Sequence, residues 1–466
     1  NFDKKNRLEV LGGFTMQGEN AEGYGFLSQN VPNESLGIAG LDQGIPGSTN
    51  TSVSEGTLTS FLGRVNYNYQ KKYLFTASFR ADGSSKFAPG KQWGYFPSAA
   101  LAWRIKDEAF MKPLKFVSEA KFRTSYGLTG NNRVGYFDRY PQLTSPISAS
   151  YSFNNSSPST GAIQASLGNQ NLKWETTAQA DMGIDLGFIK NRILFTADIF
   201  RKTTFDLLLN ADIPTTTGFA RVYKNIGKIR NEGLELTLST VNVRTTKFSW
   251  NSDFNISFNR NKIIELAENQ RNMLSTVSWD NGYTNEPLYI AALNGPAAAF
   301  FGYLTDGLYQ VDDFDVSASG AYSLKLSEPT NGMARYRIQP GDIRYKDINL
   351  DGEVNAQDRV VIGRVLPKHS GGFNNNFGYK GFDLNVFFQW SFGNQIYNAN
   401  RMMFEGNVTN KRDLNQFESY NDRWTFENQD SKMYRTGGHG QTGYYSDYYI
   451  EDGSYLRLKT VALSYS

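Results

Sequence analysis

The segment Phe248–Phe258 reads Phe-Ser-Trp-Asn-Ser-Asp-Phe-Asn-Ile-Ser-Phe and alternates apolar with polar residues almost throughout. A β-strand sends successive side chains to opposite faces of its sheet. With Ser252 as a small polar exception, one face of this strand would be formed by Phe248, Trp250, Phe254, Ile256 and Phe258. The opposite face would be formed by Ser249, Asn251, Asp253, Asn255 and Ser257. The period of two therefore predicts a strand with one apolar and one wettable face.

Similar segments recur along the 466-residue chain and predict an all-β protein with about twelve strands. The segment 382–394 is a clear second example, because Leu384, Val386 and Phe388 alternate with polar or differently facing residues. We place the strands at 7–17, 57–69, 73–81, 95–104, 117–128, 176–188, 193–202, 232–241, 247–259, 372–380, 382–394 and 454–466.

The connections between these strands alternate between short and long. Tight turns are expected at 70–72, 189–191, 242–246 and 380–381, and the connection 18–56 is expected to be long. An outer-membrane barrel has short turns at its periplasmic rim and long loops outside the cell, whereas a soluble sandwich has no reason to keep this order. The chain is therefore predicted to be an antiparallel up-and-down transmembrane β-barrel over residues 1–466, with long extracellular loops notably at 129–175, 260–371 and 395–453.

The composition limits the other classes of protein. No apolar run approaches the 18 residues of a membrane-spanning helix, while barrel strands need only about 9–11 alternating residues. The net charge of +3 gives little reason to expect a nucleic-acid partner. The chain has no Cys, which excludes disulfides and thiolate chemistry, and we interpret His369 and His439 as ordinary loop residues. Nucleophile, phosphate-binding and triad motifs are missing, so no catalytic residue is predicted and the chain is not expected to be an enzyme.

In a wide barrel the polar faces of the strands would line a wet lumen, and the apolar faces would meet outer-membrane lipid. Each residue of the polar face is more readily explained as part of the wall than as a substrate ligand. The candidate lumen residues are Asp181, Asp185, Asn251, Asp253, Asn255 and Gln389.

The segment Asp347–Asp358 has the spacing of a calcium-binding loop. Positions 1, 3, 5, 7 and 12 of this pattern are occupied by oxygen donors, and Gly352 at position 6 allows the sharp turn. A shorter Asp at position 12 resembles the dockerin variant of the loop. An Asx-rich turn without an ion is the alternative, because Asp, Asn and Gly favour turns. The expected ligands of a structural Ca²⁺ are Asp347, Asn349, Asp351, Glu353 and Asp358.

Several short motifs, in a fixed order, resemble the SusC/RagA-type TonB-dependent transporters of Bacteroidota. The first is a hairpin signature, Arg-Ala-Asp-Gly-Ser-Ser-Lys-Phe at 80–87, which is followed by Trp-Gly-Tyr-Phe-Pro-Ser-Ala at 93–99 and Trp-Arg-Ile at 103–105. The other motifs lie at 172–175 with 183–185, at 225–235, at 341–352 and at 453–459.

This resemblance implies a 22-stranded outer-membrane barrel that is closed by an N-terminal plug and covered by a SusD-like surface lipoprotein. It also implies import of oligosaccharides or peptides that is driven by TonB. About half of such a barrel corresponds to this sequence, and we expect the plug, the TonB box and further strands to lie outside it. The chain alone should therefore neither close nor transport.

Two other functions fit parts of the pattern. A passive porin or a surface-binding barrel would show the same strands without energy coupling, and an upstream plug with a TonB box would distinguish the two. A soluble carbohydrate-binding β protein would fold cooperatively without detergent.

Overall fold

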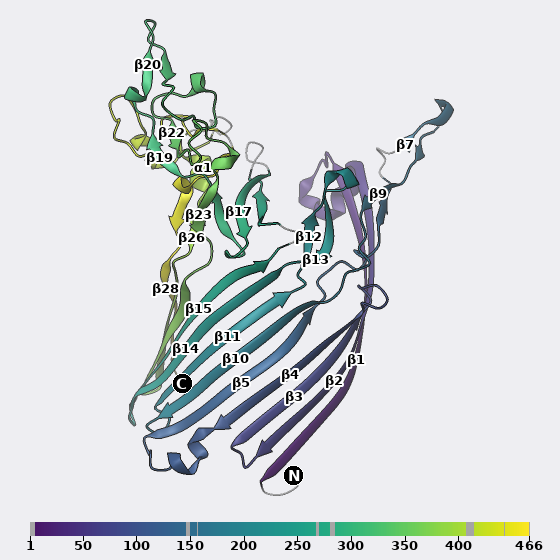
Figure 1. Ribbon diagram of the computed structural model, residues 1–466, viewed down its shortest axis with the longest axis vertical. Helices are drawn as coiled ribbons and strands as arrows, with labels where there is room; N and C mark the ends of the chain where they lie inside the picture. Colours follow the sequence, from purple (N-terminus) through teal and green to yellow (C-terminus); the bar gives the residue numbers. More distant parts are fainter. Residues whose placement is uncertain are drawn as a thin grey trace. The chain divides into compact units, whose positions relative to one another are not determined.

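The computed structural model describes residues 5–145, 150–155, 157–266, 270–279, 285–406, 414–441 and 443–465. Twelve strands form one large antiparallel sheet, and each is hydrogen-bonded to the preceding and following members of the set (Figure 1). This is up-and-down order, with β1 and β28 as the outermost strands. The twelve are β1 Asn6–Gln29, β2 Ile45–Tyr69, β3 Tyr73–Ser84, β4 Trp93–Arg104, β5 Val117–Asn131, β10 Glu175–Phe188, β11 Ile193–Phe205, β14 Lys228–Arg244, β15 Phe248–Glu265, β24 His369–Tyr379, β25 Phe382–Phe392 and β28 Tyr455–Tyr465.

Each of the twelve predicted strands overlaps one of these observed strands, and the all-β antiparallel fold is confirmed. The predicted long connection at 18–56 is wrong, because β1 and β2 pair from Asn6↔Tyr69 to Gln29↔Ile45 with one irregularity between Phe26 and Ser28. Only residues 30–44 connect them. The outer part of this hairpin is rich in Ser, Thr, Asn and Gly, so backbone pairing extends beyond the apolar alternation on which the prediction depended.

The short turns lie at or close to their predicted positions, although the turn predicted at 242–246 is observed at 245–247 because β14 continues to Arg244. In the β24–β25 turn, Tyr379 pairs with Phe382 and the two residues between them have positive φ, 47° at Lys380 and 88° at Gly381. Two successive left-handed residues match the right-handed twist of the flanking strands, which is why such turns close tight hairpins. Of the four residues between β10 and β11, the first three, 189–191, likewise have positive φ. That the short turns lie on the periplasmic side of the membrane and the long loops outside the cell stays a prediction.

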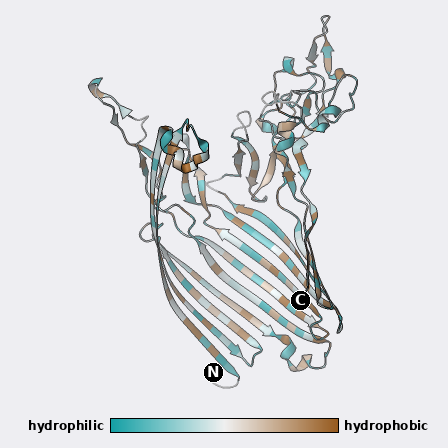
Figure 2. Ribbon diagram, turned by 180° about the vertical axis from the view of Figure 1, so that it is seen from behind, coloured by the Kyte–Doolittle hydropathy of each residue, from teal (hydrophilic) through white to brown (hydrophobic). Residues whose placement is uncertain are grey.

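The register of β15, β24 and β25 preserves the two-faced pattern (Figure 2). Residues that are directly opposite each other in neighbouring strands point to the same face. Phe254 pairs with Phe373, and Phe373 pairs with Phe388, so aromatic residues align across three strands on one face. The ring of Phe254 also lies 5.5 Å from that of Trp390 and 6.4 Å from that of Phe373. We call this side the apolar face and the opposite side the polar face.

Smaller sheets and short helices lie in the connections between the twelve strands. The only α-helix in the described ranges is α1, Ala399–Phe404. The 3₁₀-helices are η1 Glu34–Gln43, η2 Ile105–Asp107, η3 Ala109–Met111, η5 Phe153–Asn155, η6 Thr215–Thr217, η7 Val311–Asp313, η8 Arg335–Arg337, η9 Ala356–Asp358, η10 Glu418–Asp422 and η11 Asp447–Tyr449. The two-stranded sheets pair β6 Gln142–Thr144 with β9 Ile163–Ser166, β7 Ser150–Tyr151 with β8 Ser159–Thr160, β12 Leu208–Asp212 with β13 Arg221–Asn225, β19 Thr305–Leu308 with β22 Ile343–Tyr345, β20 Phe314–Val316 with β21 Tyr322–Leu324, and β26 Gln395–Tyr397 with β27 Ile450–Asp452. A four-stranded sheet is formed by β16 Asn272–Val277, β17 Glu286–Ala292, β18 Ala299–Gly302 and β23 Val360–Arg364.

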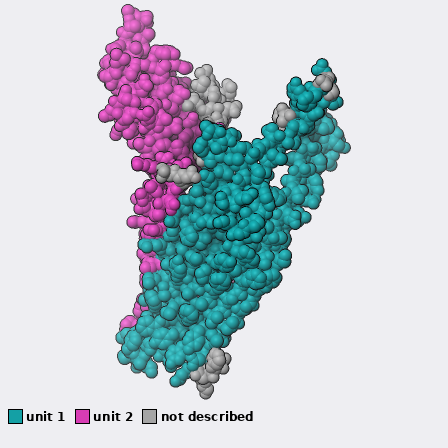
Figure 3. Space-filling model, turned by 45° about the vertical axis from the view of Figure 1, so that its right-hand side comes forward, with its two compact units in different colours: residues 1–115, 119–184, 200–228 teal, residues 116–118, 185–199, 229–466 magenta. Residues whose placement is uncertain are grey.

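The chain divides into two compact units (Figure 3). Unit 1 comprises residues 1–115, 119–184 and 200–228, and has a small core around Phe87, Phe96 and Trp174. Unit 2 comprises residues 116–118, 185–199 and 229–466. Its loops pack their own core, which is rich in buried Tyr and comprises Leu288, Phe300, Tyr303, Leu308, Ile343, Tyr345, Val354, Met402, Trp424, Tyr434, Tyr445 and Tyr449. These loops are therefore folded structures with buried interiors rather than simple connections.

The two histidines differ from the ordinary loop residues that the sequence suggested, His369 in its secondary structure and His439 in its burial. His369 is the first residue of β24, and its ring stacks 5.1 Å from that of Phe392. His439 lies in a loop but is buried, with 8% of its surface exposed. Among the helices that the structure describes, none has the length and apolar character required to cross a membrane.

Candidate functional site

The polar face of β15, β24 and β25 brings together four of the six predicted lumen residues. Asn251 pairs with Asn376, and Asp253 pairs with Asn374. Asn255 and Gln389 lie on either side of Gly372, with which both are in register. These four residues therefore share one mainly polar surface, in which Phe387, in register with Asn374, is an aromatic exception.

The sequence analysis missed the residues that organise this surface. The Nδ2 of Asn385 donates hydrogen bonds to the Oδ1 atoms of Asn374 and Asn376, at 2.7 and 2.6 Å. The sequence feature that could have indicated them is the run Asn374-Asn375-Asn376, whose first and third residues point to the same face of a strand. These bonds tie the side chains together across two strands, as expected for a wall that holds a fixed shape.

The remaining two lumen candidates are also held by neighbours. In unit 1, the Asp181 carboxylate accepts hydrogen bonds from Gln179 at 2.9 Å and Ser125 at 3.2 Å. In unit 2, Asp185 accepts a hydrogen bond from Thr196 at 3.3 Å. Both carboxylates therefore act first as parts of the wall.

Ser252, the polar exception of the apolar face, belongs to a buried hydrogen-bond network. Its Oγ donates to the Oδ1 of Asn375 at 2.7 Å and accepts from the Nδ2 of Asn242 at 2.6 Å. The indole of Trp250 donates to the same Asn375 oxygen at 3.0 Å. Ser252 and Asn375 are 8% and 7% exposed. A polar group that faces hydrocarbon is costly unless it is bonded, and here each polar side chain satisfies another.

The predicted calcium loop adopts a turn whose carboxylates bind backbone amides. Asp347 accepts from the N–H groups of Leu350 and Gly352, both at 2.7 Å, and Gly352 has a φ of 85°. The buried Asp358 accepts from the N–H of Ile348 at 2.8 Å and from that of Asn355 at 2.8 Å. Within the described ranges, no three His, Cys, Asp or Glu side chains gather closely enough to hold a metal ion. In this arrangement a Ca²⁺ would have to draw its oxygens from groups that already accept hydrogen bonds, so calcium stays a prediction.

The loops of unit 2 also form two adjacent open pockets, which we treat as the two lobes of one surface cleft and call the loop cleft. Its larger lobe has a volume of ≈ 790 Å³ and its smaller lobe ≈ 420 Å³. Ser431, Lys432 and Tyr448 line both lobes. The larger lobe is also lined by Thr305, Asp306, Gly307, Leu308, Gln310, Val311, Asp312, Gln429 and Asp430, and the smaller by Arg401, Glu405, Ser419, Asp422, Asn428 and Met433.

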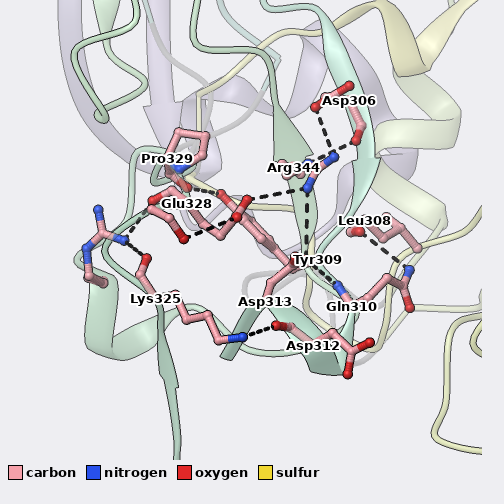
Figure 4. Close-up of polar contacts among 12 residues, drawn as sticks. Asp306, Leu308, Tyr309, Gln310, Asp312, Asp313, Lys325, Glu328, Pro329 and Arg344 are labelled. Atoms are coloured by element: carbon pink, nitrogen blue, oxygen red, sulfur yellow. Dashed lines mark hydrogen bonds and ion pairs between the residues drawn. The ribbon is translucent and has the colours of Figure 1, made fainter. Parts of the chain in front are cut away.

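Residues 305–312 form one wall of the loop cleft, and Arg344, which does not line the cleft, binds to this wall through Asp306 (Figure 4). Its guanidinium lies 3.0 Å from the carboxylate of Asp306 and donates to the Asp306 carbonyl at 3.1 Å. The same guanidinium is 3.6 Å from Glu328 and 3.9 Å from Asp313. Asp313 in turn accepts from the N–H of Gln310 at 2.7 Å, which closes a capping box at the start of η7. The wall is therefore held by contacts within the chain.

Two contacts join this wall to the connection between β25 and β28. The Trp424 indole donates to the side-chain oxygen of Gln310 at 3.2 Å. Asp447 accepts from both the N–H and the hydroxyl of Thr305, each at 2.8 Å. The lining residues of the larger lobe come from 305–312 and 429–448, which are more than 100 positions apart in the sequence, so no local spacing could have predicted this lobe.

The fold and the two-faced sheet define the class of protein. Residues 2–355 match the family described as "TonB dependent receptor-like, beta-barrel", and the chain belongs to this family. This is a family of outer-membrane receptors and transporters rather than of enzymes, and membership locates the chain in the outer membrane.

Individual relatives agree with this assignment. The chain is 33% identical to TonB-dependent receptor P26 of Formosa agariphila over 99% of its own length and 44% of that protein. It is 30% identical to TonB-dependent receptor SusC of Bacteroides thetaiotaomicron over 89% of its own length and 38% of that protein. The chain thus spans less than half the length of these relatives.

Solved structures show the same fold. The RagAB peptide importer in its "open-open" state matches 100% of this chain and 46% of its own, with a TM-score of 0.79 and 22% identity. The RagAB peptide transporter matches with a TM-score of 0.77 and 23% identity. At this level of identity the similarity concerns the fold alone.

Proposed function

We propose that this chain is the C-terminal barrel part of an importer that moves an oligosaccharide or a peptide across the outer membrane, without catalysis, using energy delivered by TonB. A SusD-like surface lipoprotein would close over the loops. The plug that TonB pulls would lie in the part of the longer protein outside this chain. In this scheme, the polar face borders the path of the substrate, and the loops of unit 2 meet the substrate first.

The observation that carries this proposal is the two-faced antiparallel sheet of twelve strands, together with membership in the TonB-dependent receptor family. A mainly apolar face suits lipid, and an opposite face rich in Asn, Asp and Gln suits a wet interior. The folded loops add a preformed cleft on the same chain. These features support import as the function, and they do not select the nutrient.

The test is uptake by cells of the native organism that produce the full-length protein. Cells would be supplied with labelled peptide or oligosaccharide pools, with and without deletion of the gene, loss of TonB, or a protonophore. The proposal expects saturable uptake that is lost in all three cases. Uptake that needs the gene but persists without TonB and without the proton gradient would favour a passive porin instead.

We further propose that Asp347, Asn349, Asp351, Glu353 and Asp358 bind a structural Ca²⁺ that orders the connection between β15 and β24. Their spacing and the left-handed Gly352 support this proposal. Since the side chains already bind backbone amides, calcium would refine an existing turn rather than create it.

A further inference from the structure

The two lobes of the loop cleft are open to the surface and share an aromatic residue. Tyr448 lines both lobes, and its ring packs 4.9 Å from that of Tyr449 and 5.6 Å from that of Tyr434. The Arg401 guanidinium lies 5.1 Å from the Tyr448 ring centroid. Burial raises the pKa of the Tyr448 phenol to about 12, so this residue stays neutral at physiological pH. A volume of ≈ 790 Å³ lies within the range of sites that enclose small ligands or a few residues of a longer one.

The charges of the lining are not balanced. Asp306 is paired with Arg344, and Glu405 is paired with Arg401 at 3.1 Å. Asp312, Asp422 and Asp430 are exposed, and their carboxylates have no ion-pair or hydrogen-bond partner in the described part of the chain. Among the lining residues, Lys432 is the only cation without such a partner, so the lining has three open carboxylates and one open ammonium group. Beside the lining, the Lys325 ammonium group donates to the backbone carbonyl of Asp312 at 2.6 Å. An opening lined by such excess negative charge attracts cations.

The open carboxylates lie in both lobes. Asp312 lies in the connection between β15 and β24, and Asp430 lies in the connection between β25 and β28; both line the larger lobe. Asp422 lines the smaller lobe. Since the two lobes share Ser431, Lys432 and Tyr448, one elongated ligand could occupy both. The contacts that Trp424 and Asp447 make across the loops hold this geometry in advance, which reduces the ordering cost of binding.

We propose that the loop cleft binds an extended cationic ligand, with ammonium or guanidinium groups at the open carboxylates and an apolar or ring surface against Tyr448. This inference rests on the proposed import function and specifies its substrate as a positively charged polymer. Two sources carry that chemistry, a Lys- or Arg-containing peptide and an oligosaccharide of amino sugars.

The experiment measures equilibrium binding to the purified full-length protein in detergent, together with its lipoprotein partner where the two copurify. Four probes form two matched pairs. The peptide Ala-Lys-Ala-Lys-Ala is compared with Ala-Glu-Ala-Glu-Ala, and the glucosamine pentamer is compared with its neutral, fully N-acetylated form. Preference for the Lys peptide identifies a peptide source, and preference for the free amine pentamer identifies an amino-sugar source.

The variant Asp312→Asn combined with Asp430→Asn keeps size and removes two open carboxylates. It should weaken binding of the preferred cationic probe about fivefold, the effect of two partly exposed ion pairs, and should flatten the salt dependence of binding. Lys432→Glu should strengthen the same binding. Asp315→Asn is the matched control, because Asp315 is exposed on β20 but does not line the cleft.

Equal affinity for the members of each pair, or unchanged binding in the double variant, would overturn the cationic-ligand proposal. Binding of only the neutral pentamer would also overturn it. TonB-dependent uptake by the wild-type protein is measured in parallel. If the wild-type protein shows TonB-dependent uptake but the double variant binds the probes like wild type, the cleft inference has failed and the import function stands. If the wild-type protein shows no TonB-dependent uptake, the import function itself has failed.

Discussion

Replacing Phe254 with Arg would test which face of the sheet meets lipid. Phe254 lies within β15 on the apolar face, where its ring stacks on that of Trp390 and meets that of Phe373 edge-on. An arginine near the bilayer midplane of a barrel costs about 2–4 kcal/mol. Each lost aromatic contact adds about 0.5–1.5 kcal/mol. The expected destabilisation is together about 3–7 kcal/mol, a large fraction of the roughly 5–15 kcal/mol that stabilises a typical folded protein.

Two control substitutions separate the contributions. Phe254→Leu removes the aromatic contacts without adding charge, and it should cost only the aromatic part. Asn255→Arg adds the same charge one residue further along β15, on the polar face and next to Gly372, and it should be close to neutral.

The assay uses the full-length protein refolded into lipid vesicles and titrated with guanidinium, with folded protein scored by its resistance to SDS at room temperature. In cells, the folded fraction in outer-membrane preparations gives the same comparison. If Phe254→Arg folds as well as Asn255→Arg, the assignment of the two faces is wrong.

Three further predictions concern other parts of unit 2. Asn375→Ala should destabilise the refolded protein by about 1–3 kcal/mol, because it leaves buried polar groups of the apolar face unpaired, and Asn374→Ala should cost less; equal effects would argue against the buried network. Calcium should release or absorb heat in calorimetry on the purified protein, and Asp351→Ala should abolish that heat, whereas no heat in the wild-type protein would refute the calcium loop. Asp447→Ala removes both hydrogen bonds to Thr305 and should speed proteolysis within the loops of unit 2 while leaving the SDS resistance of the sheet unchanged; identical proteolysis would show that this contact does not hold the cleft together.

The strands could be predicted from the sequence because side-chain alternation is a local signal. In β15 the facing of each residue follows from its position, and a tight turn such as 380–381 fixes the register of the next strand. The prediction was wrong at 18–56, where long β1 and β2 pair through their backbones and the side chains alternate poorly.

The loop cleft could not be predicted in the same way. Its walls meet through contacts such as that between Gln310 and Trp424, which are 114 residues apart. The polar exception Ser252 was visible in the sequence, but its partner Asn375 lies 123 residues away. The meaning of both features depends on tertiary contacts that a local pattern does not contain.

The most direct test of the central claim is the accessibility of single cysteines along β15 in the full-length protein in membranes. The chain has no native Cys, so each substituted residue between 250 and 257 would be the only thiol of this region. Each thiol would be labelled with a polarity-sensitive fluorophore and quenched either by brominated lipid or by aqueous iodide. The account predicts alternation, with the even positions quenched by lipid and the odd positions by iodide. Uniform quenching by iodide at all positions, or an inverted alternation, would contradict a transmembrane strand with the facing described here.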